Sequence, residues 1–175
     1  MFRRTKGVVV LTLDADESEL LGQLFGQMIE LLAPPDVPEH TDPLARLVGM
    51  DGPTEPPRDP ALARLFPAGY RDDAAAAADF RRFTEPDLRN GKVMNARIAQ
   101  ALLEEWTGTR ELTMDQAKAV MLAFNDMRLT LGTRIGIGEI HDDEDDEEVD
   151  DPAMHLYDWL TYLQGTLVDA ISAST

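Results

Sequence analysis

Residues 113–135, TMDQAKAVMLAFNDMRLTLGTRI, decide the fold class of this chain. Thr113 and Gln116 have the spacing of a capping box, in which each side chain bonds the backbone N–H of the other residue at a helix start. Apolar residues then recur every three or four positions, which is the period of one helix face. They are Ala117, Val120, Met121, Phe124, Leu131 and Ile135. The stretch therefore predicts a long helix that buries one side.

Three other regions show the same helical period. Residues 16–32 follow a capping-box-like start and end before two prolines. Residues 72–83 are alanine-rich, Glu85-Pro86 is expected to interrupt or cap them, and a further helix is expected to reach Trp106. Asp151-Pro152 supplies an N-cap and an N1 proline for a last, leucine-rich helix.

The remaining elements are small. Residues 1–13 form two short segments on either side of Lys6-Gly7, and the second segment is rich in β-branched residues, which predicts a β-hairpin. Asp42-Pro43 and Asp59-Pro60 each place an N-cap before a proline and predict short accessory helices. We therefore expect a mainly α fold: a bundle of about four main helices with short accessory helices and a small N-terminal hairpin, in one domain over residues 1–175.

An acidic tract separates the last two predicted helices. Nine of the ten residues from Asp142 to Asp151 carry a carboxylate, and no cation lies among them. Such a segment repels itself and has almost nothing apolar to bury, so it predicts a mobile, solvated loop over about residues 141–151. It lacks the spaced ligands and the glycine turn of a calcium loop, and we expect no metal there.

Charge and composition exclude several function classes. The chain has a net charge of −17, which opposes direct binding to nucleic acid or to anionic lipid. No stretch approaches the roughly 18 apolar residues of a membrane span. The basic start at Arg3 and Arg4 soon meets Asp14 and Asp16, unlike a signal peptide, and there is no cysteine. We expect a cytoplasmic protein.

No catalytic residues can be assigned from the sequence. The three histidines are too scattered for a metal triad, and no glycine-rich phosphate loop or familiar nucleophile arrangement is present. The three histidines are His40, His141 and His155. We therefore expect no enzyme, no cofactor and no metal site.

Two surfaces are candidates for binding a partner protein. On the last predicted helix, His155, Trp159 and Tyr162 share a face that is distinct from the leucine face. This face has the aromatic composition that interfaces favour. Alternatively, it is a second buried face of the helix. Between residues 81 and 97 the cations exceed the acids by three and predict a basic surface. The acidic tract either competes for this surface within the chain or mimics a phosphate backbone towards a basic partner protein. The cations of the basic surface are Arg81, Arg82, Arg89, Lys92 and Arg97.

A set of polar residues falls on or beside the helical core faces. They are Asn95, Arg97, Asn125, Asp126, Arg128 and Arg134. They form either a structural network between helices or a pocket for an anion. Arg128 lies within the stripe of Phe124 and Leu131, so we predict that it is largely buried and paired with a carboxylate or amide of another helix.

Three motifs carry a family resemblance: Arg81-Arg82-Phe83-Thr84-Glu85, Asn125-x-x-Arg128-Leu129, and Leu156-Tyr157-Asp158-Trp159-Leu160. With them the chain resembles an uncharacterised actinobacterial family known only as a domain of unknown function. The resemblance implies a cytoplasmic, mainly helical protein with no established activity, often encoded near a protease-adaptor-like gene. It implies a regulatory or adaptor role, and a thiol switch is excluded here because cysteine is absent.

Two functional hypotheses follow. The first is a non-enzymatic regulatory or adaptor protein that acts through contacts with a partner protein or with a second copy of itself. The alternative is a small-ligand binding protein or an unrecognised enzyme with an anion pocket between helices. A packed polar network with an exposed aromatic patch favours the first, and an open cavity bearing the polar side chains favours the second.

Overall fold

A computed structural model of the chain describes residues 1–34, 52–137 and 151–173. The elements in chain order are strands β1 (Phe2–Thr5) and β2 (Val8–Thr12), helices α1 (Ala15–Leu31), α3 (Pro60–Leu65) and α4 (Ala74–Ala101), strand β3 (Thr109–Leu112), and helices α5 (Met114–Arg134) and α6 (Pro152–Ser172). The mainly α fold class with a small β addition is confirmed. The accessory helix predicted at Asp42-Pro43 and the acidic loop, up to Asp150, lie outside the described residues.

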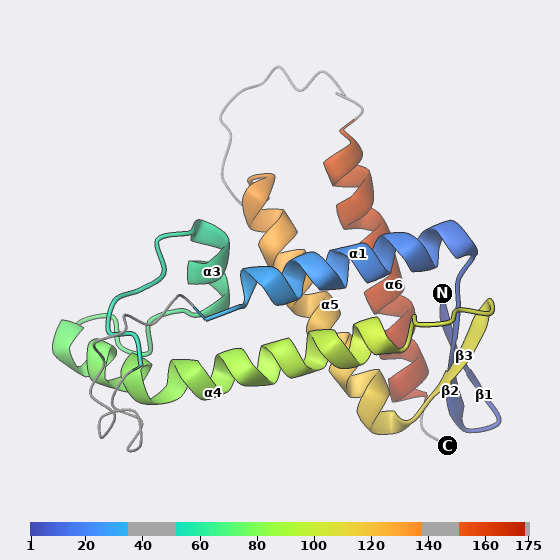
Figure 1. Cartoon of the computed structure of the whole chain (residues 1–175), viewed down its shortest axis with the longest axis horizontal. Coiled ribbons are helices and arrows are strands. Elements are labelled where there is room, and N and C mark those ends of the chain that lie inside the picture. The colour runs from blue at the N-terminus through green and yellow to red at the C-terminus, as the bar shows by residue number, and fades with distance from the viewer. Residues whose placement is uncertain (35–51, 138–150, 174–175) are drawn as a thin grey trace.

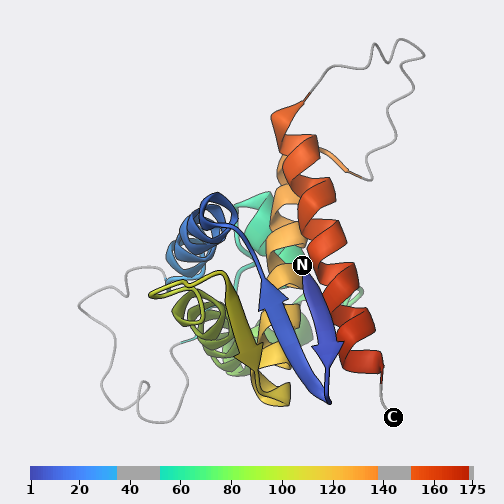
Figure 2. The same ribbon diagram turned by 90° about the vertical axis from the view of Figure 1, so that its right-hand side faces the viewer.

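The four long helices form two crossed pairs. Helices α1 and α4 lie side by side and run in opposite directions, and α5 and α6 form a second antiparallel pair behind them (Figure 1). The short helix α3 packs on α5, which also contacts α1, α4 and α6. The sheet lies at one end of the molecule, with β1 against α6 (Figure 2). Helix α5, from which the fold class was predicted, is thus the central element.

The helix starts agree with the predicted caps, with one shift. Thr113 and Gln116 form both bonds of a capping box, and Asp59 and Asp151 cap their helices in front of a proline. The cap of α1 was predicted at Asp16 with Glu19 and lies two residues earlier. Asp14 has the extended backbone of an N-cap and forms the capping box with Glu17.

Helix α4 is continuous, so the predicted interruption at Glu85-Pro86 is wrong. The helix also ends at Ala101 instead of reaching Trp106 as predicted, and Glu105 has a positive φ angle of 49°, which a helix does not allow. A proline has no N–H, and Pro86 therefore leaves the carbonyl of Arg82 without its helical donor. Gly52 packs directly on this carbonyl: a Cβ atom on Gly52 would lie 2.0 Å from the Arg82 oxygen. The chain before α3 thus covers the side of α4 that the proline opens.

The N-terminal hairpin is confirmed and is part of a larger sheet. Lys6 and Gly7 both have positive φ angles, 51° and 85°, as a two-residue type I′ turn requires. Strand β3 was not predicted, and it pairs antiparallel with β2, which gives the order β1-β2-β3. Strand β3 has only four residues, of which Leu112 alone is buried, so its sequence does not show the alternation of apolar and polar residues that predicts a strand.

Two apolar clusters hold these elements together. In the larger one, the Phe124 ring of α5 meets the ring of Phe2 at 6.0 Å and that of Phe25 at 5.6 Å, both edge to face. It joins the sheet to α1, α5 and α6. The smaller cluster joins α1, α3 and α4 and contains Leu32 and Phe66.

Candidate functional site

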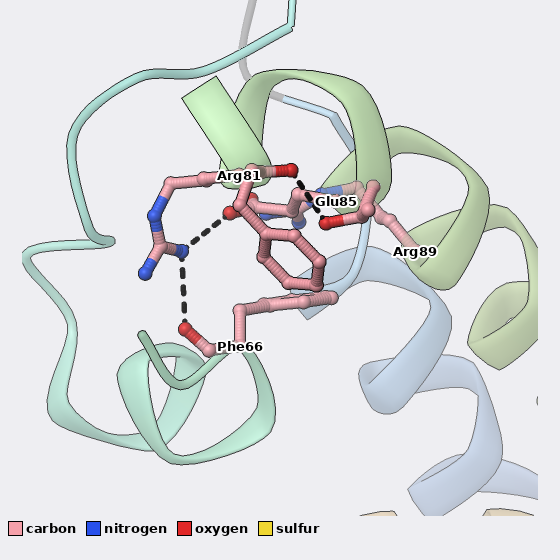
Figure 3. Close-up of polar contacts among 6 residues, drawn as sticks. Phe66, Arg81, Glu85 and Arg89 are labelled. Carbon is pink, nitrogen blue, oxygen red and sulfur yellow. Dashed lines mark hydrogen bonds and ion pairs between the residues drawn. The ribbon is translucent and has the colours of Figure 1, made fainter. Parts of the chain in front are cut away.

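The basic surface predicted around residues 81–97 is wrong for its two main members. Arg81 and Arg89 are buried, and each donates to one carboxylate oxygen of buried Glu85 at 2.7 Å (Figure 3). The spacing explains this arrangement, since residues four apart in a helix share a face. Because α4 passes through Pro86 unbroken, all three charges point into the protein.

The two arginines also close the ends of neighbouring helices. Arg81 donates to the carbonyl of Phe66 at 3.0 Å, and Arg89 donates to the carbonyl of Leu32 at 3.2 Å. Phe66 and Leu32 are the C-cap residues of α3 and α1. Cations are favourable at helix C-termini, where carbonyls lack partners. The Arg81–Glu85–Arg89 triad is therefore a structural junction of three helices.

The other cations of this segment are mostly paired. Arg82 is half-buried and bonds exposed Asp79 at 2.9 Å. Lys92 reaches across to α5, where its Nζ lies 2.6 Å from the carboxylate of buried Asp126. Arg97 alone among the five is exposed and has no ion pair among the described residues. The sequence count missed Asp79 and Asp126, so the predicted excess of positive charge does not form a surface.

Beside the triad lies an apolar patch that was not predicted. Its members are Tyr70, Phe80, Phe83 and Leu88, which are 52%, 46%, 51% and 47% exposed, and we call them the α4 patch. At about 100° per residue, Phe83 and Leu88 lie about 60° and 80° to either side of Phe80 around α4, so the three side chains cover a broad face of the helix. A groove of about 190 Å³ runs beside Phe80 and Leu88.

Local backbone and charge shape the surroundings of this patch. Gly69 lets the chain pass close to Phe80, because a Cβ atom there would lie 2.6 Å from the ring. The Tyr70 ring then meets Phe80 edge to face at 5.8 Å. Charged residues next to the patch in the sequence are mostly acidic: the exposed acids Asp72, Asp73, Asp79 and Asp87 outnumber the cations Arg71 and Arg82. Arg82 pairs with Asp79 and lies 4.8 Å from the centre of the Phe83 ring, so the surroundings keep only a net negative charge of about two.

The face predicted on α6 is open only in part. Tyr162 and His155 are exposed, but Trp159 is half-buried and packs on the larger cluster. Further along, strand β1 covers the helix, and the backbone N–H of Phe2 donates to the Thr166 hydroxyl at 3.1 Å. The structure thus supports the buried alternative for one half of this face.

The predicted polar network is divided among separate contacts. The predicted partner of Arg128 from another helix is confirmed, since its Nη1 donates to the Gln164 amide oxygen of α6 at 2.6 Å. The guanidinium is partly rather than largely buried. Asn95 is half-buried, whereas Arg97 and Asn125 are exposed. These three residues do not line a cavity together with Arg128.

Arg134 pairs with the cap of α3 rather than with a pocket residue. Its Nη2 lies 2.6 Å from Asp59, although Arg134 also borders an apolar cavity of about 300 Å³ between α1, α5 and α6. Burial raises the pKa of Asp59, but the hydrogen bonds from Arg134, Leu62 and Ala61 outweigh it and leave the pKa below its usual value. This exposed pair adds a contact between the start of α3 and the end of α5.

A second cavity, of about 360 Å³, does contain part of the predicted network. Arg128 lines it together with Arg64, Gly132, Thr133 and Tyr157. Neither Arg64 nor Tyr157 was predicted as a site residue. Arg64 lies in the last turn of a helix of six residues, which is too short to show a helical period. Tyr157 lies beside Leu156 in a motif that carried only the family resemblance.

Other site types find no support in the described parts of the chain. Within residues 1–34, 52–137 and 151–173, no group of three acidic or histidine side chains is placed to hold a metal ion. Among these same residues, no helix has the length and apolarity needed to cross a membrane. His40 and His141 lie outside the described residues.

A family model for a domain of unknown function, DUF2017, matches residues 1–171. The chain belongs to this family. The resemblance seen in the motifs is thereby confirmed, and the relatives of this DUF2017 chain are mycobacterial, hence actinobacterial. No solved structure matches the chain.

Two relatives carry names that indicate a role. A protein of Mycobacterium tuberculosis (strain ATCC 25618 / H37Rv) named oxidative stress regulator AosR is 33% identical over 179 residues, which cover 90% of this chain and 79% of the relative. A Mycobacterium leprae protein named putative oxidative stress regulator AosR is 34% identical over 179 residues, covering 90% of this chain and 80% of the relative.

Proposed function

We propose that this chain is a cytoplasmic, non-enzymatic regulatory protein that acts by binding a partner protein through the α4 patch. The exposed patch is the observation that carries the proposal. Clusters of exposed aromatic and aliphatic side chains mark binding surfaces more often than single apolar residues do. The names of the mycobacterial relatives support the regulatory part of the proposal.

The support under the patch lowers the cost of binding. Phe80, Phe83 and Leu88 extend from the same turns of α4 as Arg81, Glu85 and Arg89. The hydrogen bonds from Arg81 and Arg89 to the carbonyls of Phe66 and Leu32 hold these turns on α3 and α1. A surface that is already ordered loses less conformational entropy when a partner docks. Aromatic anchors on a fixed helix are the usual centre of an interface.

Charge indicates the kind of partner. The surroundings of the patch have a net negative charge, and the whole chain has a net charge of −17, so a second copy would meet strong like-charge repulsion. An apolar segment flanked by Lys or Arg complements both the patch and its surroundings. We therefore propose a basic amphipathic segment of another protein as the occupant, with the homodimer as the outcome that the experiment has to distinguish.

The way such a regulator responds to an oxidant is constrained by composition. The 175 residues contain no cysteine, so they cannot form a disulfide or a sulfenic acid. An oxidant signal would therefore reach this chain through its partner or through side chains other than thiols.

The proposal is tested by combining a patch variant with a matched control. A strain lacking the protein is complemented with wild type, with Phe80→Ser/Phe83→Ser, or with Leu122→Ser, which alters an α5 leucine that is 47% exposed. We expect the patch variant to lose peroxide resistance and the control to retain it, with both folded by circular dichroism.

A second experiment identifies the occupant. A photo-crosslinking amino acid at Phe83 should capture a protein with a basic segment in living cells, and the same probe at Leu122 should not. Crosslinks only to a second copy would replace the partner by a homodimer. Full complementation by the patch variant would contradict the proposal.

A small-molecule role is the second candidate, because one of the predicted network residues does border an open cavity. Arg128 lies at the cavity of about 360 Å³ beside Tyr157 and Arg64. This observation is independent of the α4 patch.

A further inference from the structure

The Arg128 side chain lacks a carboxylate partner among the described residues. Its Nη1 donates to Gln164 at 2.6 Å, its Nη2 donates to the Tyr157 hydroxyl at 3.2 Å, and its Cζ lies 5.1 Å from the centre of the Tyr157 ring. Its Nε is fully buried and has no acceptor. Two of five N–H donors are thus used in these hydrogen bonds, and both acceptors are neutral.

The position of this guanidinium is fixed by its neighbours. Gln164 is itself held, since its Nε2 donates to the carbonyl of Met121 at 3.5 Å. The Tyr157 ring lies so close to α5 that a Cβ atom on Gly132 would be 3.2 Å from it. A partly buried cation with its orientation set in advance, and with donors to spare, is suited to binding an oxyanion.

A second cation borders the same cavity. Arg64, in the last turn of α3, is exposed and forms no ion pair within the described part of the chain. The Tyr157 hydroxyl accepts from Arg128 and keeps its own proton for a further acceptor. The cavity therefore offers two arginines and one hydroxyl donor from three different helices.

The end of α5 borders the cavity, and its cap reduces the unfavourable effect of a helix C-terminus on an anion. Gly136 has a φ angle of 73°, and the N–H of Ile137 donates to the carbonyl of Gly132 at 2.8 Å, as in a Schellman cap. Carbonyls at a helix C-terminus disfavour a nearby anion. Here the cap bond occupies the carbonyl of Gly132, which lines the cavity.

We propose that this cavity is a binding site for the carboxylate or phosphate group of a small molecule, held by Arg128 and Arg64 with Tyr157 as a further donor. A volume of about 360 Å³ is at the lower end of the range for small-ligand sites. The ligand is therefore a small anionic metabolite rather than a large cofactor. The cavity is formed by α3, α5 and α6, apart from the α4 patch, so the failure of either proposal leaves the other standing.

The experiment titrates the full chain with inorganic phosphate and, separately, with citrate, at constant low ionic strength. Binding is followed by the amide NMR signals of Gly132 and Gly136 and by the melting temperature. The key variant is Arg64→Gln, which removes an exposed cation and should not affect folding. Arg97→Gln is the control, because Arg97 is also exposed but does not line the cavity.

We expect saturable shifts of both amide signals in wild type with at least one probe. Arg64→Gln should weaken binding by about tenfold or more, as the loss of one charge-assisted hydrogen bond predicts, and Arg97→Gln should change it little. Phosphate alone would indicate a phosphorylated ligand, and citrate alone a carboxylic acid. The proposal is overturned if neither probe gives saturable shifts, or if both variants weaken binding equally and the response is only to net charge.

Discussion

The junction of α1, α3 and α4 depends on the carboxylate of Glu85. Glu85→Gln would leave two buried guanidinium groups without their counter-ion, and breaking a buried ion pair in this way costs about 3–5 kcal/mol. We expect a loss of that size in the free energy of unfolding, measured by urea titration. Asp87→Asn is the matched control, since it makes the same charge change at an exposed position of α4. Its effect should stay within about 0.5 kcal/mol, and equal losses in both variants would refute the role given to Glu85.

Asp59 gives a second residue-scale prediction, on pH dependence. Its pKa is lowered in the folded state, so its charge stabilises the protein above the usual aspartate pKa of about 3.9, and this contribution is lost as pH falls through the folded pKa. Asparagine is also a good N-cap, so Asp59→Asn removes the Arg134 ion pair and keeps the cap. We expect a loss of about 0.2–1 kcal/mol at pH 7 that disappears in acid. Asp59→Ala should lose more at every pH, and a pH-independent loss in the Asn variant would argue against the ion pair.

At the residue scale, local patterns were read correctly and long-range partners were not. The capping box of Thr113 and the cap of Asp151 depend on atoms within three residues, so their signals are in the sequence itself. The partners of Lys92 and Arg128 are 34 and 36 positions away. Only packing brings such residues together, and counting charges along the chain therefore predicted a surface that does not exist.

Among the elements, α4 depends on the close approach of Gly52. A methyl group there would meet the backbone carbonyl of Arg82, which cannot move aside as a flexible side chain can. We expect Gly52→Ala to lower the free energy of unfolding by about 1–3 kcal/mol, the usual cost of overpacking. Gly91→Ala, at an open position within α4, should instead raise it by about 0.5–1 kcal/mol. Denaturant titration of both variants tests this, and a stabilised Gly52→Ala would show that the chain before α3 is not tightly packed on α4.

Helical period predicted the long helices because each has one buried and one exposed side over many turns. Helical period did not predict two features that depend on residues distant in the sequence. Pro86 is accommodated within α4 by a contact with Gly52 that lies 34 positions earlier, and β3 is recognised as a strand only by its pairing with β2. Neither feature has a signal within its own segment.

For the molecule as a whole, the parts of the candidate sites come from distant segments. The α4 patch combines Tyr70 with residues of α4, and the arginine cavity combines α3, α5 and α6. Arg128 could be singled out because a cation within an apolar stripe is unusual. Arg64 could not, since α3 has only six residues and shows no helical period. The exposed patch could not either, since helical spacing alone does not say which face of α4 remains uncovered.

The acidic tract is expected to act on the arginine cavity rather than on the basic surface that its charge first suggested. It begins five positions after Ile137, which lines the cavity, and we expect this short tether to give its carboxylates a high local concentration there. Deleting residues 142–150 removes eight negative charges. We expect phosphate or citrate to bind the deletion variant more tightly than wild type, with a difference that shrinks as salt is raised.

Net charge alone would also strengthen anion binding, so the control moves the same nine residues to the C-terminus and keeps the charge unchanged. If the tract competes for Arg64 and Arg128 through its position, the relocated variant should bind the probes more tightly than wild type does. A relocated variant that binds like wild type, beside a deletion that binds more tightly, would reduce the effect to long-range repulsion. In that case Arg64 and Arg128 would be accessible to a ligand at all times. The tract would then only set how strongly the binding of the ligand depends on ionic strength.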